Sequence, residues 1–282
     1  MATPFVNFAQ FSPIPALRNY IRYCWSIEAD MNIACKQKER FLPDGHLELI
    51  IDLGDPVLHI YDDQTYVRPE SFIAGLHENS FHIKAIGQQQ LKAIGIILKP
   101  WAVSCFLKMS LHELKGQAIA LEDIFGKEAN LLLEQIKALP TTPEKLYHFQ
   151  IFLLHRMQAP STEQFILKKL LQSIYHRKGN IKVKDLAQQV YFSERKLLRV
   201  FQRYLGLSPK SFARLIRMEE AVKAYKMQPQ KNLTDISYDL GYFDQSHFIH
   251  DFQKIAGISP KQYFLELNTL DDQFLDHEAI SA

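Results

Sequence analysis

Residues 205–212 read LGLSPKSF, and residues 256–263 read AGISPKQY. The glycine, the Ser-Pro-Lys and the final aromatic residue return at the same places, 51 residues further along the chain. Working back from them, Phe201 corresponds to Phe252 and Leu186 to Ile236, and the offset falls from 51 to 50 between these two pairs. Two copies of one helix-turn-helix unit, which differ by one residue in the turn, explain this pattern.

Each copy is predicted to hold two short helices around a turn. In the first copy, apolar residues fall at helical spacing over residues 186–205 and are interrupted at residues 191–193. Ser193 is expected to cap the second helix, because its hydroxyl can accept an unpaired backbone N–H, and Gly206 suits the left-handed residue that ends it. Ser208-Pro209 then predicts the start of another helix.

A single long helix is predicted between the two copies. After Pro209, the segment up to Lys226 contains no proline or glycine and carries apolar residues at helical spacing. At about 1.5 Å per residue it spans roughly 27 Å, close to the ~34 Å helical repeat of DNA, so the two units can enter successive major grooves on one face of a duplex. The alternative is an ordinary helical bundle in which these signals are accidental.

The second copy carries the pattern of a known family. Residues 241–248 read GYFDQSHF, and they are followed by Phe252, Gly257, Ser259-Pro260 and Tyr263. This pattern resembles the signature of AraC/XylS-type transcription regulators, and residues 217–221, RMEEA, resemble the linker helix of that family. The resemblance covers roughly residues 165–265. It implies a sequence-specific DNA-binding transcription regulator that inserts two recognition helices into successive major grooves.

Two positions depart from the family pattern. Ser237 replaces the usual alanine, and His250 stands where the family often carries arginine. The first copy is therefore expected to supply most of the DNA contact.

The resemblance places base-facing roles on Arg195, Leu198 and Arg199, and arginine can read guanine with two hydrogen bonds. The alternative is a solvated basic face that touches only phosphates. The full set of expected DNA contacts is Ser193, Arg195, Lys196, Leu198, Arg199, Arg203, Gln245, Ser246, His247, Ile249, His250 and Lys254.

The distribution of charge agrees with a DNA-binding C-terminal half. The chain has a formal net charge of only +2. Residues 161–267 hold 18 Lys and Arg against 10 Asp and Glu, whereas the rest of the chain holds 15 against 21. Basic charge is thus concentrated where phosphate neutralisation would need it.

The first 160 residues predict a different kind of fold. Short β-rich runs separated by turn residues indicate a mostly antiparallel sheet, for which a cupin-like scaffold is one option, followed by helices. The expected strands are residues 47–53, 57–61, 71–75 and 91–98, the expected helices are 100–109, 131–139 and 143–157, and residues 121–125 are expected to form a packing turn. We therefore expect an α+β domain at residues 1–160, an all-α domain with two helix-turn-helix motifs at residues 161–267, and an acidic tail at residues 268–282.

The N-terminal domain is expected to sense a ligand or to pair two copies of the chain. Residues 42–50, 75–77 and 99–101 resemble a domain found on some AraC-type regulators, where such a domain commonly binds a small molecule or mediates dimerisation. Trp25, His46 and Trp101 are the expected lining of an effector pocket, although aromatic residues in a β core are more often packing. The apolar residues of the helix at 143–157 predict a homodimer, with packing on the chain's own sheet as an equal alternative.

Two other functions stay open at this point. One is a constitutive DNA-binding protein whose first domain only dimerises; the other is a cupin-like metalloprotein or enzyme fused to a DNA-binding domain. Asp44, His46 and Glu48 have alternate spacing that could bring three metal ligands to one face of a strand. Phosphate loops, nucleophile elbows and His-Glu-x-x-His motifs are absent from the sequence. We expect no enzymatic activity, no metal and no cofactor.

Cysteine usage and hydropathy predict a cytoplasmic protein. Cys24, Cys35 and Cys105 are odd in number and lack metal-site spacing, which favours reduced thiols. No secretory signal pattern is present, and charges and a proline break the most apolar window, residues 91–109. The expected partners are double-stranded DNA, a small-molecule effector, a second copy of the chain and, for an activator, RNA polymerase.

Overall fold

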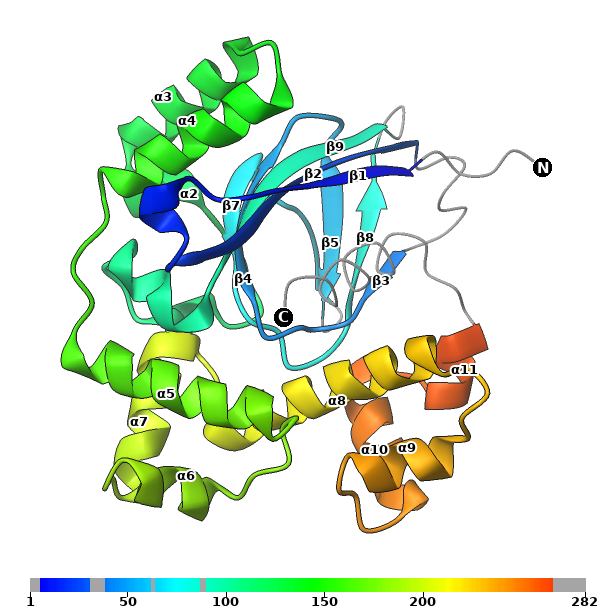
Figure 1. Cartoon of the computed structure of the whole chain (residues 1–282). Coiled ribbons are helices and arrows are strands. Elements are labelled where there is room, and N and C mark those ends of the chain that lie inside the picture. Colours follow the sequence, from blue (N-terminus) through cyan, green and yellow to red (C-terminus); the bar gives the residue numbers. More distant parts are fainter. Residues whose placement is uncertain (1–5, 31–38, 62–63, 87–89, 266–282) are drawn as a thin grey trace.

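The computed structural model describes residues 6–30, 39–61, 64–86 and 90–265, with a β domain followed by helices (Figure 1). The strands are β1 (Val6–Phe11), β2 (Ile21–Asp30), β3 (Glu39–Phe41), β4 (Leu47–Asp52), β5 (Val57–Tyr61), β6 (Gln64–Val67), β7 (Ser71–Ala74), β8 (Phe81–Ala85), β9 (Gln90–Leu98) and β10 (Ala118–Ala120). The helices are η1 (Pro15–Leu17), η2 (Pro100–Cys105), η3 (Leu111–Leu114), α2 (Leu121–Phe125), α3 (Lys127–Ala138), α4 (Thr142–Leu154), α5 (Thr162–His176), α6 (Val183–Gln189), α7 (Glu194–Leu205), α8 (Pro209–Met227), α9 (Leu233–Asp239), α10 (Gln245–Ala256) and α11 (Pro260–Leu265). The expected order of an antiparallel α+β domain and an all-α domain is confirmed.

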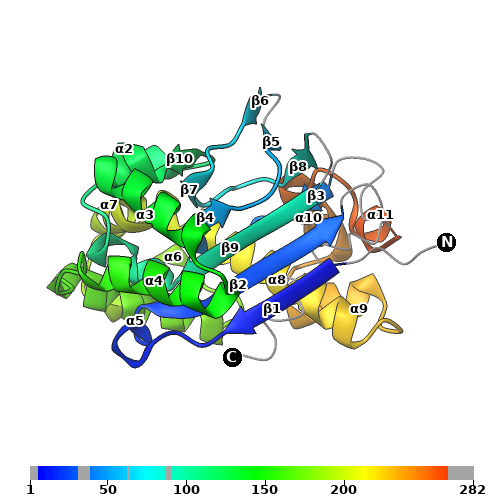
Figure 2. The same cartoon turned by 90° about the horizontal axis from the view of Figure 1, so that it is seen from above.

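Two antiparallel sheets build the N-terminal domain. The larger has the strand order β1-β2-β9-β4-β7-β10 and the smaller the order β3-β8-β5-β6. Figure 2 shows the larger sheet from above, with β1, β2 and β9 side by side. The long pairing of β2 with β9 runs from Ile21 opposite Leu98 to Asp30 opposite Gln90.

Side chains alternate across the larger sheet, as the period of a strand requires. Tyr23, Trp25 and Ile27 of β2 are buried in the cluster that faces the smaller sheet. Cys24 of the same strand is buried in the cluster on the opposite face. Gly95 of β9 makes room for the indole, because a Cβ there would lie 2.3 Å from Cε2 of Trp25.

The four predicted strands correspond to β4, β5, β7 and β9, but six strands were missed. β2 carries Arg22 and Glu28 among its apolar residues, and β3 and β10 have only three residues each, so none of them shows a clear apolar run. Two further predictions need correction. The helix expected at residues 100–109 is the shorter 3-10 helix η2, and the packing turn expected at residues 121–125 is helix α2.

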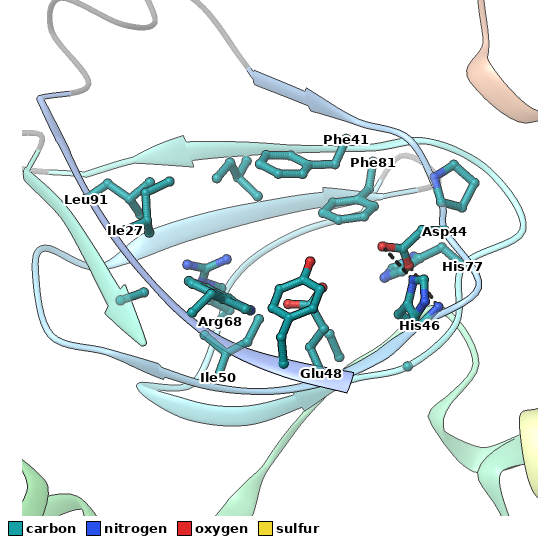
Figure 3. Close-up of a pocket in the computed structure, with 17 residues that line it drawn as sticks. Ile27, Phe41, Asp44, His46, Glu48, Ile50, Arg68, His77, Phe81 and Leu91 are labelled. Atoms are coloured by element: carbon teal, nitrogen blue, oxygen red, sulfur yellow. Dashed lines mark hydrogen bonds and ion pairs between the residues drawn. The ribbon is translucent and has the colours of Figure 1, made fainter. Parts of the chain in front are cut away.

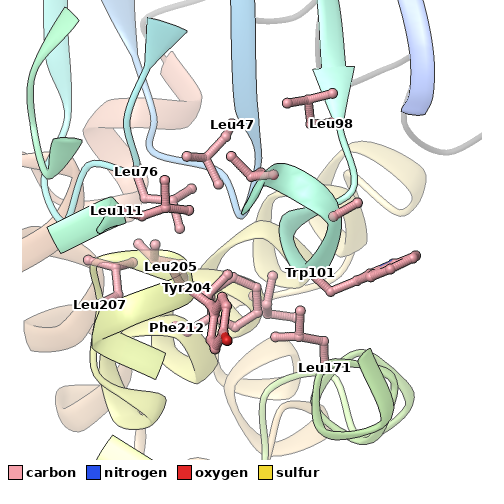
Figure 4. Close-up of a cluster of buried hydrophobic side chains, with 14 of the residues drawn as sticks. Leu47, Leu76, Leu98, Trp101, Leu111, Leu171, Tyr204, Leu205, Leu207 and Phe212 are labelled. Carbon is pink, nitrogen blue, oxygen red and sulfur yellow. The ribbon is translucent and has the colours of Figure 1, made fainter. Parts of the chain in front are cut away.

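One hydrophobic core joins the larger sheet to the C-terminal helices. The outer face of the sheet contributes Leu47 and Leu98, and the segment after β9 contributes Leu111. Leu205 and Phe212, from either side of the α7–α8 junction, belong to the same cluster (Figure 4). α5 begins at Thr162 after an N-cap at Ser161, next to the predicted boundary, yet packing continues across it. The acidic tail expected at residues 268–282 lies outside the described residues.

The two helix-turn-helix copies have the predicted caps. The side chain of Ser193 accepts a hydrogen bond from the backbone N–H of Lys196 at 3.3 Å, and the residues that end α7 and α10, Gly206 and Gly257, have φ of 74° and 75°. Helix α8 is continuous over 19 residues. Each helix-turn-helix turn also needs a left-handed residue, which is Tyr191 at φ 54° in the first copy and a glycine at the corresponding place in the second.

The cysteines agree with the expectation of reduced thiols as far as they are described. Cys24 and Cys105 are buried and form no disulfide. Burial raises the pKa of the Cys24 thiol to about 12, so it stays protonated and packs as a small apolar group. Cys35 lies outside the described residues.

The two C-terminal glycines of α7 and α10 provide a matched test of the contact between the domains. A Cβ on Gly206 would lie 2.5 Å from the carbonyl oxygen of Leu111, whereas a Cβ on Gly257 would lie 3.5 Å or more from its neighbours. Alanine at either place carries left-handed strain of about 1–2 kcal/mol, and only Gly206→Ala adds a backbone clash. Urea unfolding of the full chain should therefore show a clearly larger loss for Gly206→Ala; equal losses would mean that η3 does not hold the end of α7.

Candidate nucleic-acid interface and ligand pocket

Helix α7 buries one face and exposes a basic one. Leu197, Val200 and Phe201 are buried in the shared core. The predicted contact residues of this copy are all exposed: Ser193, Arg195, Lys196, Leu198, Arg199 and Arg203. The spacing of three and four residues between buried positions produces this division.

The cations of α7 differ in their surroundings. Arg203 lies 3.7 Å from a carboxylate oxygen of Glu163, and Lys196 lies over the ring of Phe192 at 3.9 Å. Within the described part of the chain, Arg195 and Arg199 form no ion pair with an acidic side chain. These two arginines, one turn apart, are the strongest charges that the helix presents to a partner.

Helix α10 offers a weaker surface. Ser246, His247, His250 and Lys254 are exposed, but Gln245 and Ile249 are half-buried. The amide oxygen of Gln245 accepts a hydrogen bond from Thr234 Oγ1 at 3.0 Å.

The acidic side chains of α10 are occupied within the protein. Asp244 caps the helix by accepting the N–H of His247 at 2.7 Å, and Asp251 pairs with Arg214 of α8 at 3.0 Å. The ion pair with Arg214 compensates the charge of Asp251, which reduces its repulsion of a nearby duplex.

A groove between the two copies brings two lysines that were not predicted as DNA contacts, Lys182 and Lys210, together with the predicted contact Lys254. Its lining combines the start of α6, the first turns of α8 and the exposed side of α10, and includes Lys182, Lys210 and Lys254. All three lysines are exposed, and within the described residues none pairs with an acidic side chain. Only the packing of three separate helices brings them together, so no local motif could have revealed them. The groove is suited to phosphate groups between the two recognition helices.

A second candidate site is the cavity between the two sheets of the N-terminal domain (Figure 3). Its volume is about 110 Å³, several times the roughly 10–15 Å³ that one water needs. Trp25 and His46 line it, as predicted, but Trp101 does not. Trp101 lies on the other side of the larger sheet, where its ring stacks on Phe165 of α5 at 6.4 Å and Lys168 lies over it at 4.8 Å. The prediction that Trp101 lines this pocket is therefore wrong.

The polar groups of the pocket come from three segments. Asp44 and His46 lie in the loop before β4, where Asp44 Oδ2 is 3.5 Å from His46 Nδ1 and Arg22 contacts the other ring nitrogen. Glu48 follows on β4. Arg68, which follows β6, reaches the cavity from the opposite side.

The Arg68 guanidinium is neutralised by a buried partner. It donates two hydrogen bonds to the carboxylate of Asp52, at 2.8 and 2.7 Å, and both side chains are less than a tenth exposed. Burial raises the pKa of Asp52, and the charge and hydrogen bonds of Arg68 oppose that rise. The bidentate pair fixes the guanidinium at the edge of the cavity.

Aromatic rings form a stack along the smaller sheet. Phe81 lies 5.4 Å from Phe41, 4.8 Å from His59 and 4.5 Å from His77, all at small interplanar angles. Phe81, His77 and Arg68 were not predicted as pocket residues, because strand β8 was not predicted and single histidines are usually structural.

The loop before β4 lies between the pocket and the helical domain. Asp44 and His46 face the cavity, while Gly45 between them is buried against the helices. A Cβ on Gly45 would lie 2.9 Å from Ile216 Cδ1 of α8 and 3.3 Å from Tyr175 Oη of α5. The loop therefore contacts the cavity on one side and helix α8 on the other.

Strand β3 and the start of β8 contact the second recognition helix. Arg40 Nη1 and Ser80 Oγ both donate to the carbonyl oxygen of Ala256 at the end of α10, at 2.8 and 2.9 Å. The backbone N–H of Ser80 also donates to the carbonyl of Ile255 at 2.6 Å. These donors satisfy carbonyl groups that a helix end leaves unpaired.

Among the described residues, groups of three or more His, Cys, Asp or Glu side chains placed to hold a metal do not occur. β4 begins at Leu47, so Asp44 and His46 precede the strand and do not share its face with Glu48. Over the same residues, we find no helix whose length and apolar character would let it span a bilayer.

Family profiles match both halves of the chain. One described as a helix-turn-helix domain matches residues 186–266, and one described as a domain of unknown function matches residues 9–120. An uncharacterized HTH-type transcriptional regulator of Haemophilus influenzae is 31% identical over 81 residues, which are 29% of this chain and 27% of that protein. The melibiose operon regulatory protein of Escherichia coli is 26% identical over 110 residues, 39% of this chain and 36% of that protein.

These similarities cover parts of each relative. The alignments span between 27% and 48% of the length of the first three curated relatives. The solved structure of ToxT from Vibrio cholerae aligns with 94% of this chain and 99% of its own, at a TM-score of 0.49 and 11% identity. Those last two values are too low to transfer any property of ToxT to this chain.

The buried histidines of the pocket predict a specific pH dependence. Burial, with smaller contributions from Arg68 and from the neighbouring histidine, lowers the pKa of His59 to about 4 and that of His77 to about 3. Both bind protons more readily in the unfolded chain, where the pKa is about 6.5. Stability is thus complete above that pH and is lost as the pH falls toward 4, by up to about 1.4 kcal/mol per pH unit for each histidine.

Urea unfolding at a series of pH values measures this slope. The double variant His59→Gln, His77→Gln should have a much shallower slope between pH 6.5 and 4 than the parent protein. His112→Gln, at an exposed position, is the control and should retain the parental slope. Identical slopes in all three proteins would contradict the neutral state of the buried pair.

Proposed function

We propose that this chain, which carries an AraC-type helix-turn-helix domain in residues 186–266, is a transcription regulator that binds double-stranded DNA and responds to a small molecule in its N-terminal pocket. The proposal depends on the tandem arrangement of two helix-turn-helix units around α8, with Arg195 and Arg199 of α7 exposed on its outer face. The separate pocket in the β domain supports the response to a ligand.

The first recognition helix, α7, would provide most of the sequence reading. Its Arg195 and Arg199 can each form two hydrogen bonds with guanine, whereas α10 has histidine at the corresponding place. Helix α8, at 19 residues, spans about 28 Å, so α7 and α10 can enter neighbouring major grooves. Lys182, Lys210 and Lys254 would hold phosphates between them.

Contacts between the domains connect the pocket to the DNA-binding helices, so that ligand binding can affect their positions. The loop with Gly45 touches α8, and Arg40 and Ser80, adjacent to the pocket residues Phe41 and Phe81, hold the end of α10. A ligand that shifts the loop or strand β3 therefore acts directly on the helices that position both recognition units.

The remaining partners follow from the function class. Regulators that read two half-sites commonly pair, so we propose a homodimer and, if the protein activates transcription, contact with RNA polymerase. A DNA-binding role would place the chain in the cytoplasm. The buried positions of Leu146 and Phe149 in α4 show that part of the predicted dimer face packs within its own chain.

Two substitutions compare the recognition helices. With a duplex selected from a random library by the full-length protein, Arg199→Ala should weaken binding by about 1–3 kcal/mol, because a bidentate base contact is lost. His250→Ala should cost clearly less at neutral pH. Lys127→Ala, which removes an exposed charge from α3 of the other domain, is the control and should leave affinity unchanged. Equal losses from Arg199→Ala and His250→Ala would refute the asymmetry.

The coupling loop can be tested by a substitution and its rescue. Gly45→Val should push against Ile216 and change duplex affinity about fivefold or more, the lower range of an allosteric coupling. Adding Ile216→Ala provides space and should restore affinity toward the parent value. The route through the loop would be wrong if Gly45→Val folds and binds DNA normally, or if Ile216→Ala has the same effect whether glycine or valine stands at position 45.

A further inference from the structure

The turns that precede the two recognition helices each expose one aromatic side chain almost completely. Tyr191, between α6 and α7, is 97% exposed, and Phe243, between α9 and α10, is 87% exposed. Within the described residues, these are the two most exposed of the large hydrophobic side chains, and neither packs against the hydrophobic core. Packing within the chain therefore does not account for either ring.

The backbone at Tyr191 makes an aromatic residue unfavourable there. Tyr191 has φ 54°, in the left-handed region that bulky residues rarely adopt, whereas Gly241 holds the corresponding place in the second copy at φ 73°. Glycine at position 191 would adopt this conformation without strain. A strained position that the fold itself does not need is commonly part of a functional site.

Phe243 is the residue by which the two turns differ. One residue, Phe192, separates the left-handed residue from the N-cap in the first copy, and Tyr242 and Phe243 separate them in the second. Tyr242 belongs to the core and Phe192 packs against it, so Phe243 is the additional residue and explains the change of the repeat offset from 50 to 51. An apolar residue just before an N-cap often packs on the fourth residue of the helix, here Phe248. Phe248 instead contacts Tyr242, with ring centroids 5.4 Å apart.

Both turns lie at the helix ends that point away from the contacts with the β domain. The carbonyl of Leu111 lies against the C-terminal end of α7, and Arg40 and Ser80 bind the C-terminal end of α10. Each helix has 12 residues and is about 18 Å long. The turns at the N-terminal ends are thus that far along each helix from the β domain, at the end that a recognition helix presents to DNA.

We propose that Tyr191 and Phe243 are DNA contacts, and that their rings pack on apolar groups of the duplex beside each major groove. Tyr191 precedes the N-cap of α7 by two residues and Phe243 precedes that of α10 by one, so both lie within about 7 Å of a helix start. The apolar groups that a duplex offers there are thymine methyl groups and deoxyribose carbons. The proposal rests on the proposed function, because it takes the duplex as the partner.

Substitution of each ring tests the contact in the full-length protein, with a duplex that it selects from a random library. Tyr191→Gly and Phe243→Ser should each weaken binding about fivefold or more, the effect expected when roughly 40 Å² of apolar contact is lost. Leu131→Ala, which removes an exposed apolar side chain from α3 of the other domain, is the control and should leave affinity unchanged. Parental affinity in either turn variant would overturn the inference.

Stability and salt dependence distinguish an apolar DNA contact from other effects. Tyr191→Gly should unfold at the same or a higher urea concentration than the parent, because it removes left-handed strain. The dependence of affinity on salt should stay parental in both turn variants, whereas Lys210→Ala, which removes a charge from the groove, should reduce the slope by about one. A lower urea midpoint in Tyr191→Gly would assign this ring to the fold and contradict the proposal.

A duplex with uracil in place of thymine identifies the apolar group. A loss of affinity that shrinks on the uracil duplex assigns the contact to the methyl groups, and an equal loss on both duplexes assigns it to the sugars; either result supports the proposal. Variants that bind DNA like the parent but no longer regulate transcription by RNA polymerase would show that the turns contact a protein, which refutes this inference and leaves the DNA-binding role standing. A parent protein that binds no duplex would refute the proposed function and this inference with it.

Discussion

The arrangement depends on one apolar contact, in which the outer face of the larger sheet and the C-terminal helices share a hydrophobic core. Leu47 and Leu111 of the N-terminal domain and Leu205 and Phe212 of the helical domain are each 1% exposed or less. Fully burying a side chain of this size contributes about 1.5–3 kcal/mol to the free energy of folding. Separating the domains would expose these side chains and lose several such contributions. Domains joined only by a linker would be free to move; here the core fixes the helical units on the sheet.

The ends of helices α7 and α10 show how this core connects the helical domain to the pocket. Both α7 and α10 end in a left-handed glycine, and both ends lie on the β domain: the first under the carbonyl of Leu111, the second beside Arg40 and Ser80. Both glycines end their helices, and Gly206 also permits close approach of the other domain. Phe41 and Phe81, the residues next to Arg40 and Ser80, line the pocket, so the pocket and the end of α10 contact neighbouring residues of the same segments.

The sequence was most informative where structure is set locally. Caps such as Ser193, the continuous helix α8 and the exposed arginines of α7 follow from spacing and from single residues, and the structure places them as expected. The pocket was harder to predict, because its walls come from strands that pair across long stretches of chain. Trp25 and His46 were named as single residues and line the cavity, whereas Trp101, also named, lies on the other side of the larger sheet. Arg68 was not named, because its position at the cavity depends on its pairing with Asp52. The groove of lysines depends on tertiary packing alone.

The central claim, that a shared core holds both recognition helices in one rigid unit, predicts how binding depends on DNA spacing. We would map hydroxyl-radical protection by the full-length protein on a selected duplex, and repeat the measurement after inserting five base pairs between the two protected patches. The account predicts two patches about 10 base pairs apart on one face of the duplex, and loss of the second patch with weaker binding when the insertion turns it to the opposite face. Two patches retained at undiminished affinity on the lengthened duplex would contradict it.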